Sequence, residues 1–105
     1  MNKTTINEAI VYLKKMLLIN GLHIDSIALF GSALSGVMNK NSDIDLIIIS
    51  PDFRNKDLFE RSQMKMKPEI ATLKKFEIPM DIINLYPEEY DDSKFKMYYQ
   101  SKIVA

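Results

Sequence analysis

The sequence predicts an α+β protein, in which helices flank a small mixed β-sheet. Three short apolar runs, at residues 23–30, 43–50 and 79–86, are bounded by turn residues, as is typical of strands. Two longer segments, residues 5–20 and 57–75, carry apolar side chains at three- and four-residue spacing, the pattern of amphipathic helices. With 105 residues, the chain is long enough for one domain with a modest core.

Composition excludes several classes of protein. Fourteen basic and fourteen acidic side chains cancel, whereas a general nucleic-acid binder would show a basic excess. The chain has no cysteine, so it has no disulfide, no thiolate metal site and no cysteine nucleophile, which is compatible with a cytoplasmic protein. No apolar run approaches the roughly 20 residues that a membrane span needs, and the N-terminus lacks the apolar core of a signal peptide. We therefore expect no membrane association.

Capping residues and prolines predict where the helices begin and end. Thr5 and Glu8 have the spacing of a capping box, and Asn20 with the following glycine forms a stop signal. Pro68 is expected to break or restart the second helix, because proline removes a backbone donor and clashes with the preceding turn. Pro87 and the two acids after it predict the first turn of a last helix.

The C-terminal tail is expected to dock on the body in a form that the sequence leaves open. Five apolar or aromatic side chains are available for this contact: Phe95, Met97, Tyr98, Tyr99 and Ile103.

Two aspartates open the most hydrophobic run of the chain. Asp43 and Asp45 are two residues apart on a predicted strand, so both side chains point to the same face, roughly 7 Å apart along the chain. Ionised carboxylates beside a buried strand are costly unless they are paired or bound to metal. If the Gly31 turn and this pair form one site, the first two strands are antiparallel. A parallel third strand then brings Asp81 beside the pair.

This arrangement suits divalent cations. Mg²⁺ prefers oxygen ligands and keeps positions open for substrate phosphates, and a third carboxylate would complete a two-metal arrangement. The alternative is a strand that merely begins with polar residues at a loop. We favour the metal site because the pair adjoins four consecutive apolar residues and follows a Gly-Ser turn.

Gly31 and Ser32 end a strand and open a helical turn. Backbone N–H groups at such a position bind anions, glycine allows close approach of a phosphate, and the serine hydroxyl can donate; a plain N-cap is the alternative. Ser42 can fix the entry to the second strand. His23 is assigned to the surface. A solvated helix face is favoured for three basic residues, although they could reach a triphosphate: Arg54, Lys56 and Arg61. Four acids are assigned to a helix start and loop and not to a metal site: Glu88, Glu89, Asp91 and Asp92.

Taken together, these motifs resemble a known signature. Gly31-Ser32, Gly36 and the run from Ser42 to Leu46 resemble the nucleotidyltransferase superfamily related to DNA polymerase beta. The resemblance is nearest to the minimal nucleotidyltransferases, covers residues 1–105 as one domain and implies their fold. It implies that Gly31, Ser32 and Ser42 bind a nucleoside triphosphate, most simply ATP. It also implies that two Mg²⁺ ions are held by the carboxylates of Asp43, Asp45 and Asp81, the last helping to deprotonate the attacking hydroxyl.

The resemblance also implies a partner and exposes one departure. Minimal nucleotidyltransferases often pair with a helical HEPN protein, as antitoxin with toxin, and some transfer a nucleotide to a tyrosine of that partner. Many relatives carry an arginine after the Gly-Ser pair, where this chain has Ala33, Leu34 and Ser35. Hence two functions stay open: an enzyme that acts on a hydroxyl of a protein, or an inactive module that neutralises its partner. Self-association is also left open.

Overall fold

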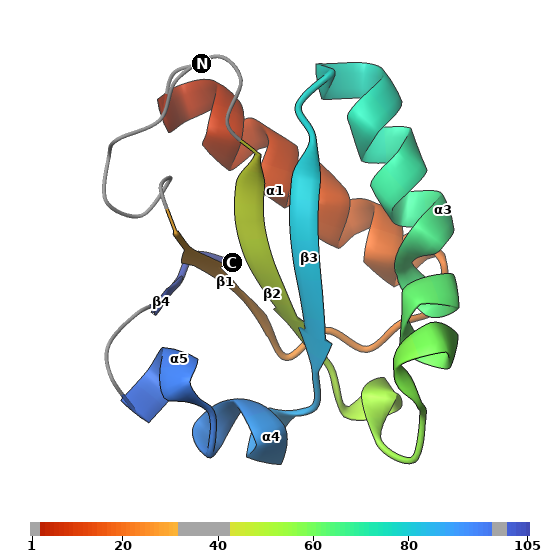
Figure 1. The fold of residues 1–105 in the computed structure, drawn as a ribbon. Coiled ribbons are helices and arrows are strands. Elements are labelled where there is room, and N and C mark those ends of the chain that lie inside the picture. Colours follow the sequence, from red (N-terminus) through yellow and green to blue (C-terminus); the bar gives the residue numbers. More distant parts are fainter. Residues whose placement is uncertain (1–2, 32–42, 98–100) are drawn as a thin grey trace.

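The computed structural model describes residues 3–31, 43–97 and 101–105, and it confirms the α+β class (Figure 1). Ser32 and Ser42 therefore lie outside the described residues. The helices are α1 (Lys3–Ile19), α3 (Leu58–Phe76), α4 (Pro87–Asp91) and α5 (Lys94–Met97), with a 3₁₀ turn, η1 (Pro51–Phe53). The strands are β1 (Ser26–Phe30), β2 (Ile44–Ile49), β3 (Met80–Leu85) and β4 (Ser101–Ile103). No helix in these ranges is long and apolar enough to cross a membrane.

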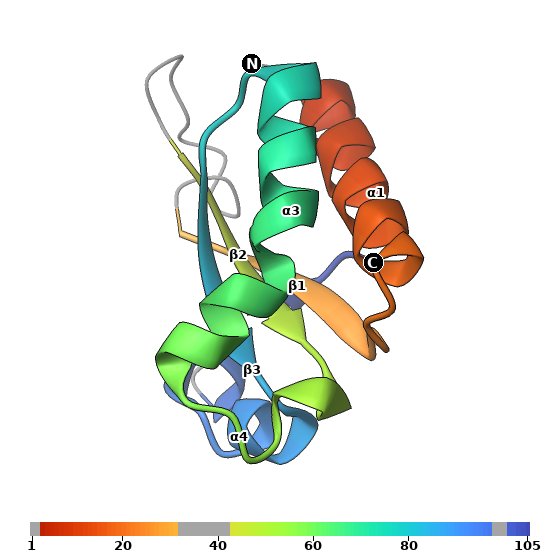
Figure 2. The same cartoon turned by 90° about the vertical axis from the view of Figure 1, so that its right-hand side faces the viewer.

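The four strands form one sheet in the order β3-β2-β1-β4. β1 is antiparallel to β2 and β4, whereas β2 and β3 are parallel, so both predicted pairings of the first three strands are confirmed. Figure 2 shows α1 and α3 side by side on one face of the sheet, and α4 lies at the end of the sheet where β3 finishes.

The central strand β2 is buried on both faces, as its unbroken apolar run predicts. Leu46 and Ile48 belong to the larger core beneath α1 and α3, whereas Ile47 and Ile49 pack with Tyr90 on the opposite face. Each of these isoleucine and leucine side chains contributes about 1.5–3 kcal/mol when fully buried. β2 therefore holds the first residues of the strand in a fixed place.

Helix α3 corrects the expectation about Pro68. The helix runs unbroken through it, and the proline ring is itself buried. Proline inside a helix costs about 3 kcal/mol, so tertiary packing has to offset that cost here. Thr72 donates its hydroxyl to the Pro68 carbonyl at 2.8 Å, and a capping box between Asp57 and Glu60 secures the start of the helix.

Helix α1 begins at Lys3, so Thr5 lies inside the helix and the predicted capping box there is wrong. A helix start depends on the whole first turn and its packing, so the spacing between Thr5 and Glu8 is by itself weak evidence for one.

The C-terminal tail docks through β4 and one aromatic ring. β4 adds a short antiparallel strand to β1, and Val104 N–H donates to the Ile27 carbonyl at 2.9 Å. The Phe95 ring packs on Phe30 with centroids 4.8 Å apart. Ile103 pairs with Ala28 in this strand, and its side chain remains 48% exposed. Tyr98 and Tyr99 lie beyond the part of the chain that the structure describes.

Candidate functional site

The site begins where β1 ends against the first residues of β2. In the antiparallel register, Phe30 lies opposite Asp45, and Gly31 follows with a φ of +70°. A Cβ added to Gly31 would lie 3.0 Å from Cγ of Asp45 and closer still to its Oδ2. Only glycine combines this left-handed backbone with so close an approach. The backbone of the turn therefore lies directly against the Asp45 carboxylate.

The parallel pairing of β2 and β3 brings the next carboxylate alongside. Asp81 is the register partner of Asp45, as the sequence predicts. Because side chains alternate along a strand, Asp45 and Asp81 lie on the face that also carries Ile47 and Ile83, away from α1 and α3. Asp43 directly precedes β2 and is exposed, as is Asp81, whereas Asp45 is partly buried. Three acidic residues thus share one end of the sheet.

Mutual repulsion marks these carboxylates as electrostatic neighbours. The pKa of Asp45 is raised above its ordinary value of 3.8, first by burial and then by the charges of Asp81 and Asp43. Among the residues that the structure describes, no ion pair neutralises any of the three. Like charges held together without a partner are typical of sites that bind a cation or a reacting group.

The donor chemistry of this acidic end fits Mg²⁺, with one qualification in geometry. Within residues 3–31, 43–97 and 101–105, no three acidic or histidine side chains are gathered tightly enough to hold an ion by themselves. Mg²⁺ does not require such a cage, because it is typically bound by one or two carboxylates together with substrate phosphates and water. Asp43 and Asp45 supply carboxylates of that kind at an accessible edge.

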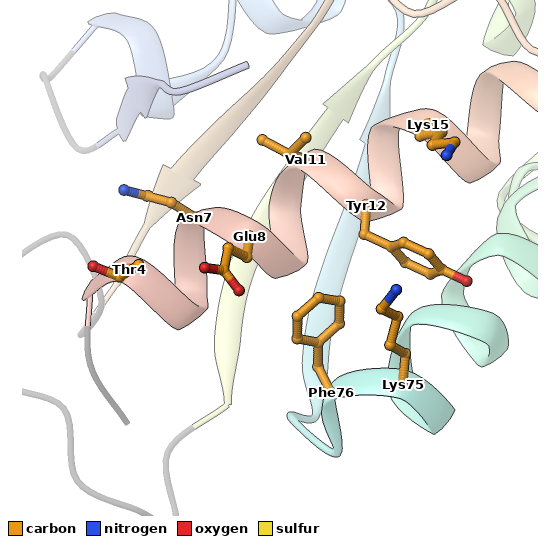
Figure 3. A pocket seen from close by; sticks show the side chains of 8 residues that line it. All are labelled: Thr4, Asn7, Glu8, Val11, Tyr12, Lys15, Lys75 and Phe76. Carbon is orange, nitrogen blue, oxygen red and sulfur yellow. The ribbon is translucent and has the colours of Figure 1, made fainter.

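A hollow among the described residues lies away from this acidic end. Its volume is about 550 Å³. Figure 3 shows the side chains that line it, which come from α1 and from the C-terminal end of α3. Tyr12 and Phe76 contact each other edge to face there, and Lys75 lies over the Tyr12 ring. None of the three aspartates lines this hollow. The chemistry of the carboxylates, and not the size of the cavity, therefore identifies the candidate site.

The basic residues after β2 lie at the other end of the sheet. Arg54 pairs with Glu88, and its Nε donates to that carboxylate at 2.8 Å. Arg61 is only 6% exposed, and it donates to Glu89 at 2.7 Å and to the Asn84 carbonyl at 3.0 Å. The expectation of a solvated face is thus wrong for Arg61, because its side chain reaches from α3 to Asn84 in β3 and Glu89 in α4 and is buried between them. Both arginines are used in structural pairs away from the aspartates.

The surface positions predicted for His23 and Lys56 are confirmed, and so is the helix start predicted at Glu88 and Glu89. The His23 side chain is 83% exposed and contacts Asp52 at 3.2 Å, and Lys56 is exposed. The acids of the last helix belong to α4, where Glu89 also accepts the Tyr86 N–H at 3.1 Å. The Arg61 network had no signal in the sequence, since a lone arginine on a helix is most often exposed. The contact between Gly31 and Asp45 did have a signal in the sequence, because the glycine directly follows a predicted strand.

Comparison with known proteins decides the family. The sequence model of the nucleotidyltransferase domain matches residues 8–103 of this chain. The chain belongs to the nucleotidyltransferase domain family. This match spans the acidic end of the sheet and all four strands, so the resemblance inferred from the sequence is confirmed. No curated protein sequence matches the chain significantly.

Solved structures share the fold of this nucleotidyltransferase domain at low sequence identity. A putative nucleotidyltransferase from Sulfolobus solfataricus is 21% identical, with a TM-score of 0.56 over 98% of this chain and 87% of its own. A chain of a toxin-antitoxin complex solved with AMP-PNP is 20% identical in sequence, with a TM-score of 0.62 over 94% of this chain and 72% of its own. A chain of the complex between a tri-AMPylated HEPN toxin from Shewanella oneidensis and an MNT antitoxin is 18% identical in sequence. Its TM-score is 0.51 over 95% of this chain and 70% of its own.

Proposed function

We propose that this protein transfers a nucleoside monophosphate from a nucleoside triphosphate, ATP in the simplest case, to a hydroxyl of a HEPN-type partner protein. The observation that carries the proposal is the placement of Asp45 between the Gly31 backbone and Asp81. Membership of the nucleotidyltransferase domain family supports the reaction class. The two toxin-antitoxin neighbours, one solved with AMP-PNP and one AMPylated, support the choice of substrate and partner.

In the proposed reaction, the acceptor oxygen bonds to the α-phosphorus, the bond from that phosphorus to the β-phosphate oxygen breaks, and pyrophosphate leaves. Asp43 and Asp45 would hold Mg²⁺, with two ions expected. When bound, the metal neutralises charge that develops on the phosphates. Asp81 takes the proton of the acceptor hydroxyl, a role that its exposed position on the adjacent strand permits. Gly31, with Ser32 and Ser42, would receive the triphosphate.

The electrostatics of Asp45 support a role in binding cations. Burial and two like charges raise its pKa, so its ionised form is disfavoured and would be stabilised by a nearby cation. A bound divalent ion would remove the repulsion among the three aspartates. We therefore expect ATP binding to depend on Mg²⁺ and on Asp45.

Two measurements test the proposal. In the first, ATP is titrated into the protein by calorimetry with and without Mg²⁺, and binding is expected only with the metal. In the second, ATP labelled at the α-phosphate is incubated with Mg²⁺ and a HEPN-type partner, and label is expected on the partner.

Asp45→Asn should abolish both signals. Asp25→Asn is the matched control, because Asp25 is an exposed acid whose N–H bonds to Ile49 at the other end of β2. Loss of label transfer in neither variant, or in both alike, would overturn the proposed reaction.

A second candidate is a module that binds and neutralises its partner without catalysis. The segment Ala33–Ser35, which has no basic residue where many relatives have arginine, favours it. Partner binding that survives simultaneous replacement of Asp43, Asp45 and Asp81 by Asn, with no label transfer by the unmodified protein, would select this candidate. Nucleotide-dependent binding would select the enzyme.

A further inference from the structure

The outer side of α3 carries an apolar stripe that is open to solvent. It consists of Phe59, Met66, Ile70 and Leu73, which are 71%, 46%, 44% and 43% exposed. These residues are separated by seven, four and three positions, so they follow one side of the helix over about four turns. We call this set the α3 stripe.

The α3 stripe faces directly away from the protein's own core. The buried side chains of the helix are Arg61, Pro68 and Thr72. Each stands two positions after a stripe residue, which is a rotation of about 200° around the helix axis. The sheet and α1 occupy the buried side (Figure 2), so the core does not account for the apolar side chains of the stripe.

We infer that the α3 stripe binds the same stripe of a second copy of this chain, in an antiparallel pair related by a two-fold axis at Met66. Phe59 lies seven positions before Met66 and Leu73 lies seven positions after it. Two antiparallel helices that cross at Met66 therefore place Phe59 of each copy opposite Leu73 of the other. A two-fold interface requires such self-complementarity, in which residue i contacts j and j contacts i.

Charges beside the stripe favour the same antiparallel register. Glu60 and Lys74 lie on one flank of the stripe, six positions before and eight positions after Met66, and both are exposed. In the pair, Lys74 of one copy comes within about 3 Å, along the helix axis, of the level of Glu60 on the other. Symmetry repeats this contact, so two opposite-charge pairs flank the stripe. Such exposed pairs add little affinity, but they select orientation.

Two features keep this association weak. Lys67 lies on the same flank, next to the two-fold axis, so the Lys67 side chains of the two copies come close together and their like charges oppose pairing. A single helix also offers less area than the roughly 1,200–2,000 Å² of stable interfaces. We therefore expect a dimer that forms reversibly at high protein concentration, which leaves the acidic end of the sheet free.

Crosslinking tests the register, because the chain has no cysteine of its own. Met66→Cys places one thiol on the proposed axis, and a bis-maleimide of about 8–10 Å matches the separation of packed helix axes. We expect Met66→Cys to form covalent dimers at least tenfold faster than Val11→Cys, a control on α1 that is 63% exposed. Adding Ile70→Glu to the Met66→Cys protein should abolish this difference. Equal rates for the two single-cysteine proteins would overturn the inference.

Sedimentation of the unmodified chain and two lysine variants adds a test that does not depend on crosslinking. Lys67→Ala should tighten the dimer roughly twofold by removing the like-charge contact, whereas Lys74→Ala should weaken it by a similar factor. Circular dichroism verifies that each variant is folded. Loss of binding to a HEPN-type partner in Ile70→Glu, without self-association of the unmodified chain, would instead assign the α3 stripe to that partner and refute the pairing of copies.

Discussion

Replacing Gly31 by alanine tests the close approach at the centre of the candidate site. The backbone there has a φ of +70°, and alanine in the left-handed conformation costs about 1–2 kcal/mol. The new Cβ would also lie 3.0 Å from Cγ of Asp45, so the carboxylate has to turn away. An off-rotamer side chain adds about 0.5–1.5 kcal/mol. The expected loss in free energy of unfolding is about 1.5–3.5 kcal/mol from these two costs.

Gly21 provides a matched control. Its φ is +89°, but nothing lies within 4 Å of an added Cβ, so Gly21→Ala has only the backbone cost. For a domain of this size, each kcal/mol lowers the melting temperature by about 4–8 °C. Gly31→Ala should therefore melt several degrees below Gly21→Ala.

A double-mutant cycle isolates the contact. In an Asp45→Ala background, Gly31→Ala should cost no more than Gly21→Ala does, because the carboxylate is gone. Thermal unfolding by circular dichroism gives the stabilities, and calorimetric titration with Mg²⁺ and ATP tests the site, where Gly31→Ala should lose binding and Gly21→Ala should keep it. If the two alanine variants melt alike and bind alike, the close approach of Gly31 to Asp45 is refuted.

Three further predictions concern charge. Because the pKa of Asp45 is raised in the folded protein, the folded state binds more protons than the unfolded chain, and the protein becomes more stable as the pH falls through that pKa. Asp45→Asn should therefore raise the melting temperature at pH 7, by an amount that shrinks toward pH 3.8. A constant difference across a pH series of melts would contradict this. Arg61→Ala leaves the Glu89 carboxylate without its partner and should lower stability by about 3 kcal/mol in a urea titration, with Arg61→Lys intermediate; an unchanged midpoint would rule out a structural role. The backbone N–H of His23 lowers the pKa of Asp52 below its ordinary value of 3.8, so Asp52→Ala should cost about 1 kcal/mol at pH 7. The cost should fall as the pH drops from 3.8 through the lowered pKa of the folded state, where the carboxylate becomes protonated; a loss that grows on acidification would exclude this cause.

The sheet could be predicted from the sequence because its central strand has strong local signals. The run from Leu46 to Ile49 is apolar without a break, which only burial on both faces explains. Once the Gly31 turn and the aspartates were assumed to share a site, the strand directions and the position of Asp81 followed from geometry. The placement of these residues is confirmed, whereas their roles in nucleotide and metal binding stay predictions.

Features that depend on packing could not be predicted. The buried position of Pro68 offsets a local penalty that sequence rules treat as decisive. Arg61 is buried because α4 presents Glu89 to it, a contact between residues 28 positions apart. β4 has one apolar residue among three, and it forms because the edge of β1 offers unpaired backbone groups.

The two ends of the sheet differ in how their charges are arranged, and this division has an evolutionary consequence. Charges at the α4 end are matched, Arg54 with Glu88 and Arg61 with Glu89, whereas those at the β2 entrance repel one another. Mutations at the first end change the stability of the fold alone, whereas mutations at the second change stability and, in the proposed function, also ligand binding. A lineage could therefore gain stability at the α4 end without disturbing the proposed reaction.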